Sequence, residues 1–581
     1  MRLIAATLFL LAALSASSSS ADAQLIDNII EGCVPETEVN LETDYFPHKV
    51  RRKWRECQSG KRMIIVVSYF ILTFLALHIP ILQYKPPTIF TYNTDTDIYG
   101  EKFTPDNTTD LLTITYHNTY KIVTNLHQNV SYLLYQCGTI PPQDEIDSGK
   151  HHLVIPVPHT GGIVITQTTQ VAPIELLGLR ENIIAYIGNP DLISSPCMRY
   201  KMYNESEPSI QVLWNPDDPY NSTINDQLQA DFVASHPDTL VISGPTDEPP
   251  YAARTINDAG TQERTNVATF DWIALYAALF NLEAMSNQIS ADTQARYDCT
   301  STNAQLIVAQ KGTADRRKRK LATSSAFVRK LESNATATAS NDLASKHPND
   351  IHILWATYFT GYNWSVADCS TWDNAFYCEY ATHCGTNIIS RPPEMGYFEN
   401  YGGPTNYWYV NDDELLELGK DADIFIFPSD RWEDVYADKK AVLDQIKAVQ
   451  TQQVYDTQGS GSNAWFEQRY AEYDVVGLDM CNLVGSNNPN VPHTRKWFRN
   501  IFTEPIGELP GCKIPQELDE PYIPRGADCE LLTEEDFDEG GEVVYKDPTT
   551  TSTTPESAAT ATSVFQVMAM TSVLAVLIAA M

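Results

Sequence analysis

Short apolar runs alternate with helix-like stretches along most of the chain from residue 111 onward. Strands are expected at residues 111–116, 120–124, 132–135, 163–166, 183–187 and 240–243, and again at 351–357, 423–428 and 453–455. Helical periodicity is found at residues 173–178, 224–235, 412–418 and 438–450, the first of them closed by Gly178. Alternation of this kind predicts mostly parallel sheets covered by helices, an α/β fold.

A long helix pattern separates the two alternating regions. Its apolar face spans residues 271–296 and is formed by Trp272, Ile273, Tyr276, Leu279, Phe280 and Leu282. Residues 311–346 are polar and rich in Ala, Thr and Ser, which indicates an exposed insertion. The pattern therefore predicts two Rossmann-like lobes, 111–270 and 301–505, joined by one long helix within a linker at 271–300.

The first 23 residues have the form of a secretory signal peptide. Arg2 precedes an apolar core at residues 3–14, and Ala21-Asp22-Ala23 is a small-x-small cleavage site. The alternative is an N-terminal anchor helix, although the apolar core is short for a bilayer. Sequons for N-glycosylation, which agree with export, begin at Asn107, Asn129, Asn204, Asn221, Asn334 and Asn363.

An N-terminal extension at residues 24–110 contains an almost continuously apolar segment, 63–84. The preceding residues 49–62 hold seven bases and one acid, so the positive-inside rule predicts a membrane helix with a cytoplasmic N-side. That orientation conflicts with a cleaved signal peptide. A buried strand would be too long. A translated in-frame intron at residues 60–83 is the third alternative, and a transcript across this region would distinguish them.

The C-terminal residues form three successive segments. Residues 506–548 are predicted to be a solvated acidic tail, and the stretch 517–542 holds eleven acids and one base, Arg525. Residues 549–563 resemble a Thr/Ser stalk, and residues 564–581 carry no charge. This last segment is interpreted either as a single membrane helix or as the removable signal for a GPI anchor. Both alternatives predict a body tethered to the outer or lumenal side of a membrane, at the cell surface or in the endomembrane system.

Charge and cysteine content narrow the classes of function. The net charge of −34 argues against nucleic-acid binding, which requires a basic face. The 11 cysteines predict up to five disulfides in an oxidising compartment, and a local disulfide among Cys369, Cys378 and Cys384 is favoured over a zinc site. The basic run at residues 316–320 is interpreted as a solvated patch or as a protease cut site of Arg-x-Lys-Arg form.

Sequence motifs of enzymes are absent. The chain has no GxSxG, P-loop, HExxH or GxGxxG pattern. We therefore expect a non-enzymatic protein with no catalytic residues, no catalytic cofactor and no metal site.

Four stretches resemble the helical-backbone (class III) periplasmic substrate-binding proteins, which serve importers of cobalamin, siderophores and haem. The first, at residues 163–186, contains Glu175-Leu-Leu-Gly-Leu and Ile183-Ile-Ala-Tyr. The others are residues 231–244, 414–427 and 465–479, so the resemblance extends over about residues 111–502. Together with the signal peptide, sequons and tail, the chain resembles the algal cobalamin acquisition proteins. The extension 24–110, the insertion and the acidic tail have no bacterial counterpart.

The resemblance implies a cell-surface protein that binds cobalamin between its lobes for uptake. The implied partners are cobalamin, a membrane and an unidentified transporter or endocytic receptor. The alternative is an iron-siderophore or haem binder. Since such clefts lie at the carboxyl ends of strands, the expected ligand contacts are Thr168, Thr169, Trp214, Tyr220, Phe359, Tyr362, Trp465, Glu394 and Tyr397. Trp214 and Trp465 are expected to form opposing aromatic walls of the cleft.

Overall fold

The computed structural model describes residues 102–103, 109–203, 208–218, 222–245, 252–325, 346–361, 363–369, 376–400 and 406–545. The predicted signal peptide, segment 63–84, stalk and terminal apolar segment lie outside these residues. So do Asn107, Asn204, Asn221 and Asn334. Within the described part of the chain, no helix is both long and apolar enough to cross a bilayer.

Lobe 1 is built on a five-stranded parallel sheet in the order β7-β6-β5-β8-β9. The strands are β5 (Ile163–Ile165), β6 (Ile183–Tyr186), β7 (Gln211–Val212), β8 (Leu240–Ser243) and β9 (Thr255–Asn257). The lobe also contains helices α4 (Val171–Leu176), α5 (Pro196–Tyr203) and α6 (Ser222–Ser235). Gly178 has φ +69° just after α4, the left-handed conformation that glycine adopts most readily at a helix end. The sequence pattern predicted β5, β6, β8, α4, α6 and this glycine stop, but not β7, β9 or α5.

A four-stranded sheet precedes lobe 1 in the chain. It comprises β1 (Leu112–Tyr116), β2 (Tyr120–Asn125), β3 (Val130–Gln136) and β4 (Leu153–Val157), with the short helix α3 (Gln143–Asp147) before β4. The first three strands are antiparallel, so the strands expected at residues 111–116 and 120–124 form a hairpin, and β3 pairs with β4 in parallel. The fully buried Lys121 of β2 forms an ion pair with Glu283, so this sheet is joined to the start of the longest helix.

Lobe 2 contains a mixed sheet around β10 (His352–Tyr358). On one side lie the parallel strands β15 (Ile424–Ile426) and β16 (Val454–Asp456), with β17 (Arg499–Asn500) antiparallel at the edge. The short parallel strand β12 (Asn387–Ile388) pairs with the start of β10 on the edge opposite β15. On the other side lie the antiparallel strands β11 (Trp364–Val366), β14 (Asn406–Val410) and β13 (Tyr397–Asn400). The sequence pattern did not predict this antiparallel half.

The helices of lobe 2 are α10 (Phe376–His383), α11 (Asp412–Gly419), α12 (Trp432–Leu443), α13 (Lys447–Gln450) and α14 (Tyr473–Leu483). The helix expected at residues 438–450 is in fact the end of α12 and the separate α13. Ile446 has extended backbone angles between them, and Lys439 is non-helical within α12.

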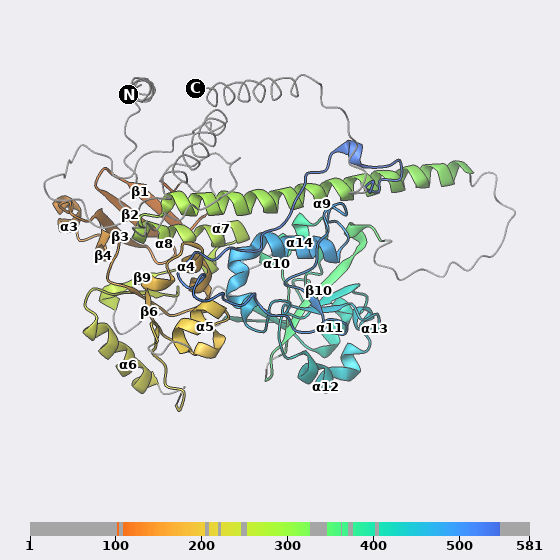
Figure 1. Cartoon of the computed structure of the whole chain (residues 1–581). Helices are drawn as coiled ribbons and strands as arrows, with labels where there is room; N and C mark the ends of the chain where they lie inside the picture. Colours follow the sequence, from red (N-terminus) through yellow and green to blue (C-terminus); the bar gives the residue numbers. More distant parts are fainter. Residues whose placement is uncertain are drawn as a thin grey trace, which may run out of the picture.

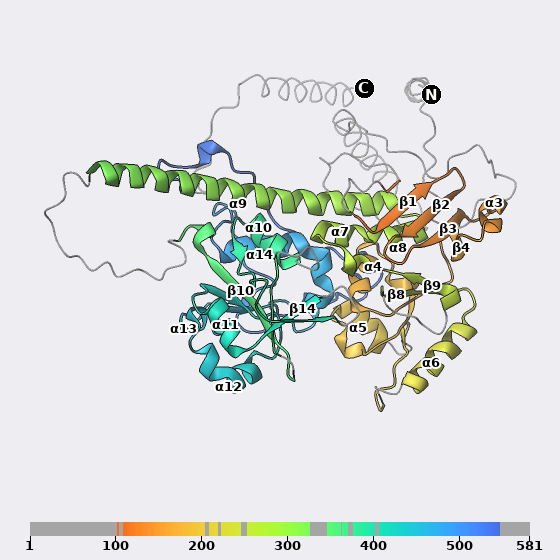
Figure 2. The same cartoon turned by 180° about the vertical axis from the view of Figure 1, so that it is seen from behind.

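The connection between the lobes begins later and runs further than the sequence pattern predicts. Residues 266–280 form α7 (Asn266–Asp271) and α8 (Ile273–Phe280), and Asn281 then adopts a left-handed conformation with φ 55°. The long helix is α9 (Glu283–Ser325), with 43 residues and a length of about 65 Å. Figures 1 and 2 show α9 running along one side of both lobes. The helix break was missed because Asn281 stands between Phe280 and Leu282, so the apolar pattern of α8, all of whose residues are buried, continues into the next helix across a single polar residue.

Residues 505–531, which we name the C-terminal strap, cross from lobe 1 to α9. The disulfide Cys197–Cys512 joins the strap to α5 of lobe 1, and Cys299–Cys529 joins it to α9. Figure 1 shows the end of this segment, in blue, returning along α9. The expectation of a solvated tail at residues 506–548 is therefore wrong for this part, because the strap is covalently fixed at two points.

Two arginines hold the strap by polar contacts. Nη1 of the buried Arg180 donates to the carbonyl oxygens of Glu517, Leu518 and Glu520, at 2.6–2.9 Å. Arg525 of the strap forms an ion pair with the buried Glu472 of lobe 2, with Nη2 2.5 Å from Oε2. The strap therefore contacts both lobes through buried charged groups, although most of its acidic side chains face solvent.

The predicted local disulfide is confirmed as Cys369–Cys378, and Cys384 pairs instead with Cys481 of α14. The largest apolar core is continuous from lobe 1 through α8 and α9 into lobe 2, and contains Ile163, Tyr276, Tyr297 and Trp497 among its members. A shared core of this kind favours a fixed arrangement of the lobes.

Candidate functional site

The carboxyl ends of the parallel strands face each other across the junction of the two lobes. In lobe 1, β6 is followed by the short 3-10 helix η6 (Pro190–Leu192). In lobe 2, β16 is followed by a Ser/Gly-rich loop and the 3-10 helix η11 (Ala464–Phe466). Open α/β sheets place their binding sites at such strand ends, because the loops there are free to vary.

The two loops are joined by hydrogen bonds across the junction. Nδ2 of Asn463 donates to the carbonyl oxygen of Asp191 at 2.9 Å. Oγ1 of Thr168, which follows β5, donates to the carbonyl oxygen of Phe466 at 3.4 Å. These contacts bring together segments almost 300 positions apart in the chain.

An open groove of ≈ 460 Å³ lies at this junction. Its walls come from both lobes and from the strap: Asp191, Ile193, Ser194, Pro196, Arg199, Ser460, Gly461, Ser462, Asn463, Ala464, Gly507, Glu508, Leu509 and Gly511. The volume falls within the ~300–1,000 Å³ typical of small-molecule sites. The groove is the candidate binding site.

Glu467 lies buried beneath the groove and connects its two sides. Its Oε2 and Oε1 accept from the backbone N–H groups of Ser194 and Ser195, at 2.8 and 2.7 Å. Burial, opposed in part by these hydrogen bonds and reinforced by the nearby Glu175, raises the pKa of Glu467 to about 7. The wall formed by residues 191–196 is therefore held by a carboxyl group that titrates near neutrality.

The neighbouring Glu175 of α4 completes a reciprocal network. It pairs with Arg180, with Nε 2.6 Å from Oε1, and accepts from Oγ of Ser195 at 2.6 Å. Nε2 of Gln468 donates to Oε2 of Glu175 at 2.8 Å and to Oε1 of Glu467 at 3.1 Å. Each lobe thus contributes a buried carboxyl group whose hydrogen-bond donors come partly from the other lobe.

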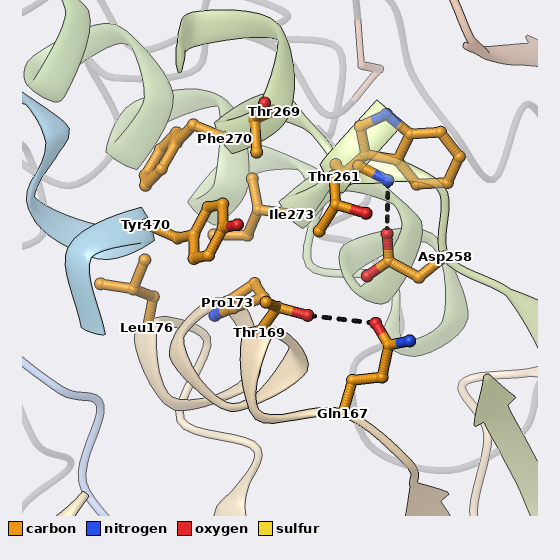
Figure 3. Close-up of a pocket in the computed structure, with 12 residues that line it drawn as sticks. Gln167, Thr169, Pro173, Leu176, Asp258, Thr261, Thr269, Phe270, Ile273 and Tyr470 are labelled. Carbon is orange, nitrogen blue, oxygen red and sulfur yellow. Dashed lines mark hydrogen bonds between the residues drawn. The ribbon is translucent and has the colours of Figure 1, made fainter. Parts of the chain in front are cut away.

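A second, much smaller cavity of ≈ 30 Å³ lies elsewhere between the two lobes, among residues of α4, α7 and the 3-10 helix that contains Tyr470. Figure 3 shows Thr169 and Gln167 of lobe 1 on one side and Tyr470 of lobe 2 near Phe270 and Leu176. The cavity has room for ordered water rather than for a ligand. Of the two threonines predicted as contacts, Thr168 therefore touches lobe 2 near the groove, whereas Thr169 lines this small cavity.

The predicted aromatic contacts have different environments. The Trp465 side chain is 2% exposed and packs against Trp497 and Phe498, with ring centroids 6.1 and 5.6 Å away. Trp214 follows the edge strand β7 and is half-buried. The pairing of these two tryptophans as cleft walls stays a prediction. If this pairing is correct, Trp465 contributes to the cleft wall from a buried position in the core of lobe 2.

Phe359 and Tyr397 meet on lobe 2. Both rings contact Tyr409 of β14, with centroid distances of 6.0 and 5.6 Å. Glu394 is exposed in the loop before β13. Tyr220 and Tyr362 lie outside the described residues.

Sequence reasoning missed several residues of the groove. Phe466, which is 56% exposed at the junction beside the predicted contact Trp465, does not itself line the groove. Ser462 and Asn463 stand three and two residues before the predicted contact Trp465, so their position near the site was accessible from the sequence. The strap residues carried no such signal, because a segment predicted to be solvated is not expected to form a wall.

Comparisons with known proteins give a similarity of overall structure only. No protein-family model matches the chain, and no curated protein matches it. A periplasmic heme-binding protein from Pseudomonas aeruginosa is 8% identical and aligns over 58% of this chain and 96% of its own, with a TM-score of 0.36. A periplasmic solute-binding protein from Mycobacterium smegmatis is 13% identical over 56% and 91%, with a TM-score of 0.34. The heme-binding protein HmuT is 13% identical over 55% and 84%, with a TM-score of 0.29. Similarity of this degree identifies no ligand. The nature of the ligand is inferred below from the residues that line the groove.

Proposed function

We propose that this chain is an exported, non-enzymatic binding protein that captures cobalamin in the groove between its lobes for uptake at a membrane surface. The observation that carries the proposal is the groove of ≈ 460 Å³ at the strand ends, lined from both lobes. Four disulfides between described cysteines support passage through an oxidising compartment. The membrane anchor, the glycans and the uptake partner are part of the proposal.

The chemistry of the walls favours a neutral ligand with many amide groups. Small hydroxyl, amide and backbone groups predominate, from Ser460 to Asn463 and at Ser194. Such groups can donate to and accept from an amide rim. The corrin ring of cobalamin has an apolar face and an amide rim, and its cobalt is already coordinated within the ligand.

Haem and ferric siderophores fit this lining less well. Haem iron requires an axial His, Tyr, Met or Cys, and none of these is present among the described groove-lining residues. An anionic siderophore requires a cationic cleft, whereas the groove holds Arg199 against Asp191 and Glu508. Nη1 of Arg199 is moreover bonded to the carbonyl oxygen of Ile193. Haem or siderophore binding is therefore the second candidate.

A binding titration of the intact exported protein against cyanocobalamin, haemin and a ferric siderophore tests the proposal. Saturable binding of cyanocobalamin alone is expected. Ser462 is exposed within the groove, so Ser462→Trp should weaken this binding by ~1–3 kcal/mol or more through steric exclusion. Ala234→Trp on the exposed surface of α6 is the matched control and should bind as the unmodified protein does. Preferential haemin binding, or normal cyanocobalamin binding by Ser462→Trp, would overturn the proposal.

A further inference from the structure

A second large hollow adjoins the groove beneath the C-terminal strap. This chamber has a volume of ≈ 710 Å³, and its walls include Glu175, Arg180 and Gln468 on one side and strap residues 509–525 on the other. Three prolines, Leu509 and Ile523 give the lining an apolar part, and charged side chains, Arg180 and Arg525 among them, complete it. No residue predicted from the sequence as a ligand contact lies among its walls.

The chamber and the groove are separated by one short piece of chain. Pro196, Leu509 and Gly511 line both hollows, so the segment 508–511 is a partition between them. Together the hollows exceed ~1,000 Å³, the upper end of ordinary small-molecule sites. That volume suits a ligand too large for the groove alone.

The backbone of the partition is anchored at both ends. On one side the N–H of Gly507 donates to the carbonyl oxygen of Gln458 at 3.0 Å, and a Cβ at Gly507 would lie 1.8 Å from the carbonyl oxygen of Gly459. On the other side Cys512 is bonded to Cys197. Within the described part of the chain, residues 508–511 take part in no recorded hydrogen bond between these two anchors. The segment is therefore held by its two anchors and by the packing of Leu509 on the large apolar core, without hydrogen bonds of its own.

A buried acceptor without a protein partner points to a ligand on the chamber side. Gln468 is 1% exposed, and its Nε2 is occupied by the two carboxyl groups, while its Oε1 has no hydrogen-bond partner. Buried polar atoms are rarely left unpaired, because the loss of water costs about 1–3 kcal/mol. A hydroxyl or amide donor of a bound molecule would satisfy this oxygen.

We infer that the groove and the chamber are two compartments of one site, which takes a bipartite ligand. A polar-rimmed body occupies the groove, and an arm with an apolar end and a hydrogen-bond donor passes the partition into the chamber, whose lining is partly apolar and partly charged. This inference rests on the proposed function and extends it. For cobalamin, the arm is the nucleotide side chain, whose aromatic base matches the apolar lining and whose ribose hydroxyl can donate to Gln468.

The test compares two ligands and two strap variants. Ile523 is 85% exposed at the chamber wall, so Ile523→Trp covers the chamber without disturbing the core. Ile514 lies on the same strap, is 41% exposed and is not a chamber residue, which makes Ile514→Trp the matched control. The ligands are cyanocobalamin and cobinamide, the same corrin without its nucleotide arm. Affinities are measured by titration of the intact protein.

Ile523→Trp should raise the Kd for cyanocobalamin by about tenfold and leave the Kd for cobinamide unchanged, whereas Ile514→Trp should change neither. Equal effects of Ile523→Trp on both ligands, or no effect on either, would overturn the two-compartment site. Ser462→Trp tests the proposed function independently of the chamber, since it should weaken the binding of both ligands by blocking the groove. If Ser462→Trp leaves both affinities intact, the groove itself is wrong.

Discussion

Replacement of Glu467 by glutamine should remove a large part of the pH dependence of stability. Its carboxyl group is fully buried between the lobes, and burial is the main reason that its pKa rises from the ordinary 4.5 to about 7. The folded state therefore holds a proton that the unfolded chain releases between these two pH values. The stability that the protonated Glu467 gives the folded state is fully present below pH 4.5 and is lost as the pH rises through 7.

The size of the effect follows from the interval between the two pKa values. At about 1.4 kcal/mol for each pH unit, the ionised carboxyl group makes the folded state about 3 kcal/mol less stable at pH 8 than the protonated group does at low pH. Glutamine has the same shape and stays neutral. Its single oxygen can accept from the backbone N–H of Ser194 or of Ser195 but not from both, so the variant loses one acceptor at every pH and only the pH-dependent part of the difference is diagnostic.

Chemical denaturation at pH 5 and pH 8 measures the free energy of unfolding of each protein. Other buried acids, among them Asp258, Glu379 and Asp474, also have raised pKa values and shift both proteins equally. The difference between Glu467→Gln and the unmodified protein should therefore move in favour of the variant by about 2.5 kcal/mol from pH 5 to pH 8, since part of the change already occurs below pH 5. Glu433→Gln, exposed on α12, is the control. Parallel pH profiles for Glu467→Gln and the unmodified protein would refute the reasoning.

Three further predictions concern the aromatic residues, the lobes and the basic run. Trp465→Ala should lower the free energy of unfolding by about 3–5 kcal/mol, as for other large buried aromatics, whereas Phe466→Ala should leave stability unchanged and weaken cyanocobalamin binding by ~1–3 kcal/mol. Calorimetry measures the stability and titration the binding of both variants, and the reverse pattern would show that the assignment is wrong. Small-angle scattering should change only slightly on ligand binding, since one core and the strap join the lobes, and a large contraction would contradict this. Cleavage after residue 319 should give two bands on a reducing gel but one without reductant, because Cys197–Cys512 and Cys299–Cys529 both bridge the cut; a single full-length band under reducing conditions would exclude processing.

The sequence predicted those parts of the fold in which local pattern and burial agree. β8 was located at its observed bounds because all four of its residues are apolar or small and buried, between a His-Pro break and a glycine. α11 begins at an Asn411–Glu414 capping box that is visible in the sequence. The helix break at Asn281 was missed, because an asparagine in the left-handed conformation leaves no mark in an apolar run.

The site was less predictable than the fold, since it depends on contacts between distant segments. The position after β16 was expected, but the pattern could not tell that Trp465 faces the core while Phe466 faces the junction. Both are large aromatics in a 3-10 turn, whose direction is set by tertiary packing. The strap was missed for a related reason. Its acidic composition resembles that of a solvated tail, and only Cys512 and Cys529 indicated attachment.

The two covalent anchors of the strap also determine how a mechanical load would pass through the molecule. A pull on the chain beyond Tyr545 reaches Cys529 before any residue that lines the groove, and Cys299 carries it into the 43-residue α9. Groove residues 507–511 lie beyond that junction, between Cys529 and lobe 2, and so bear little tension. The long helix would carry the tension, and the binding groove would carry almost none. Drag on the body, or the pull of a moving membrane, would then leave the shape of the groove unaltered.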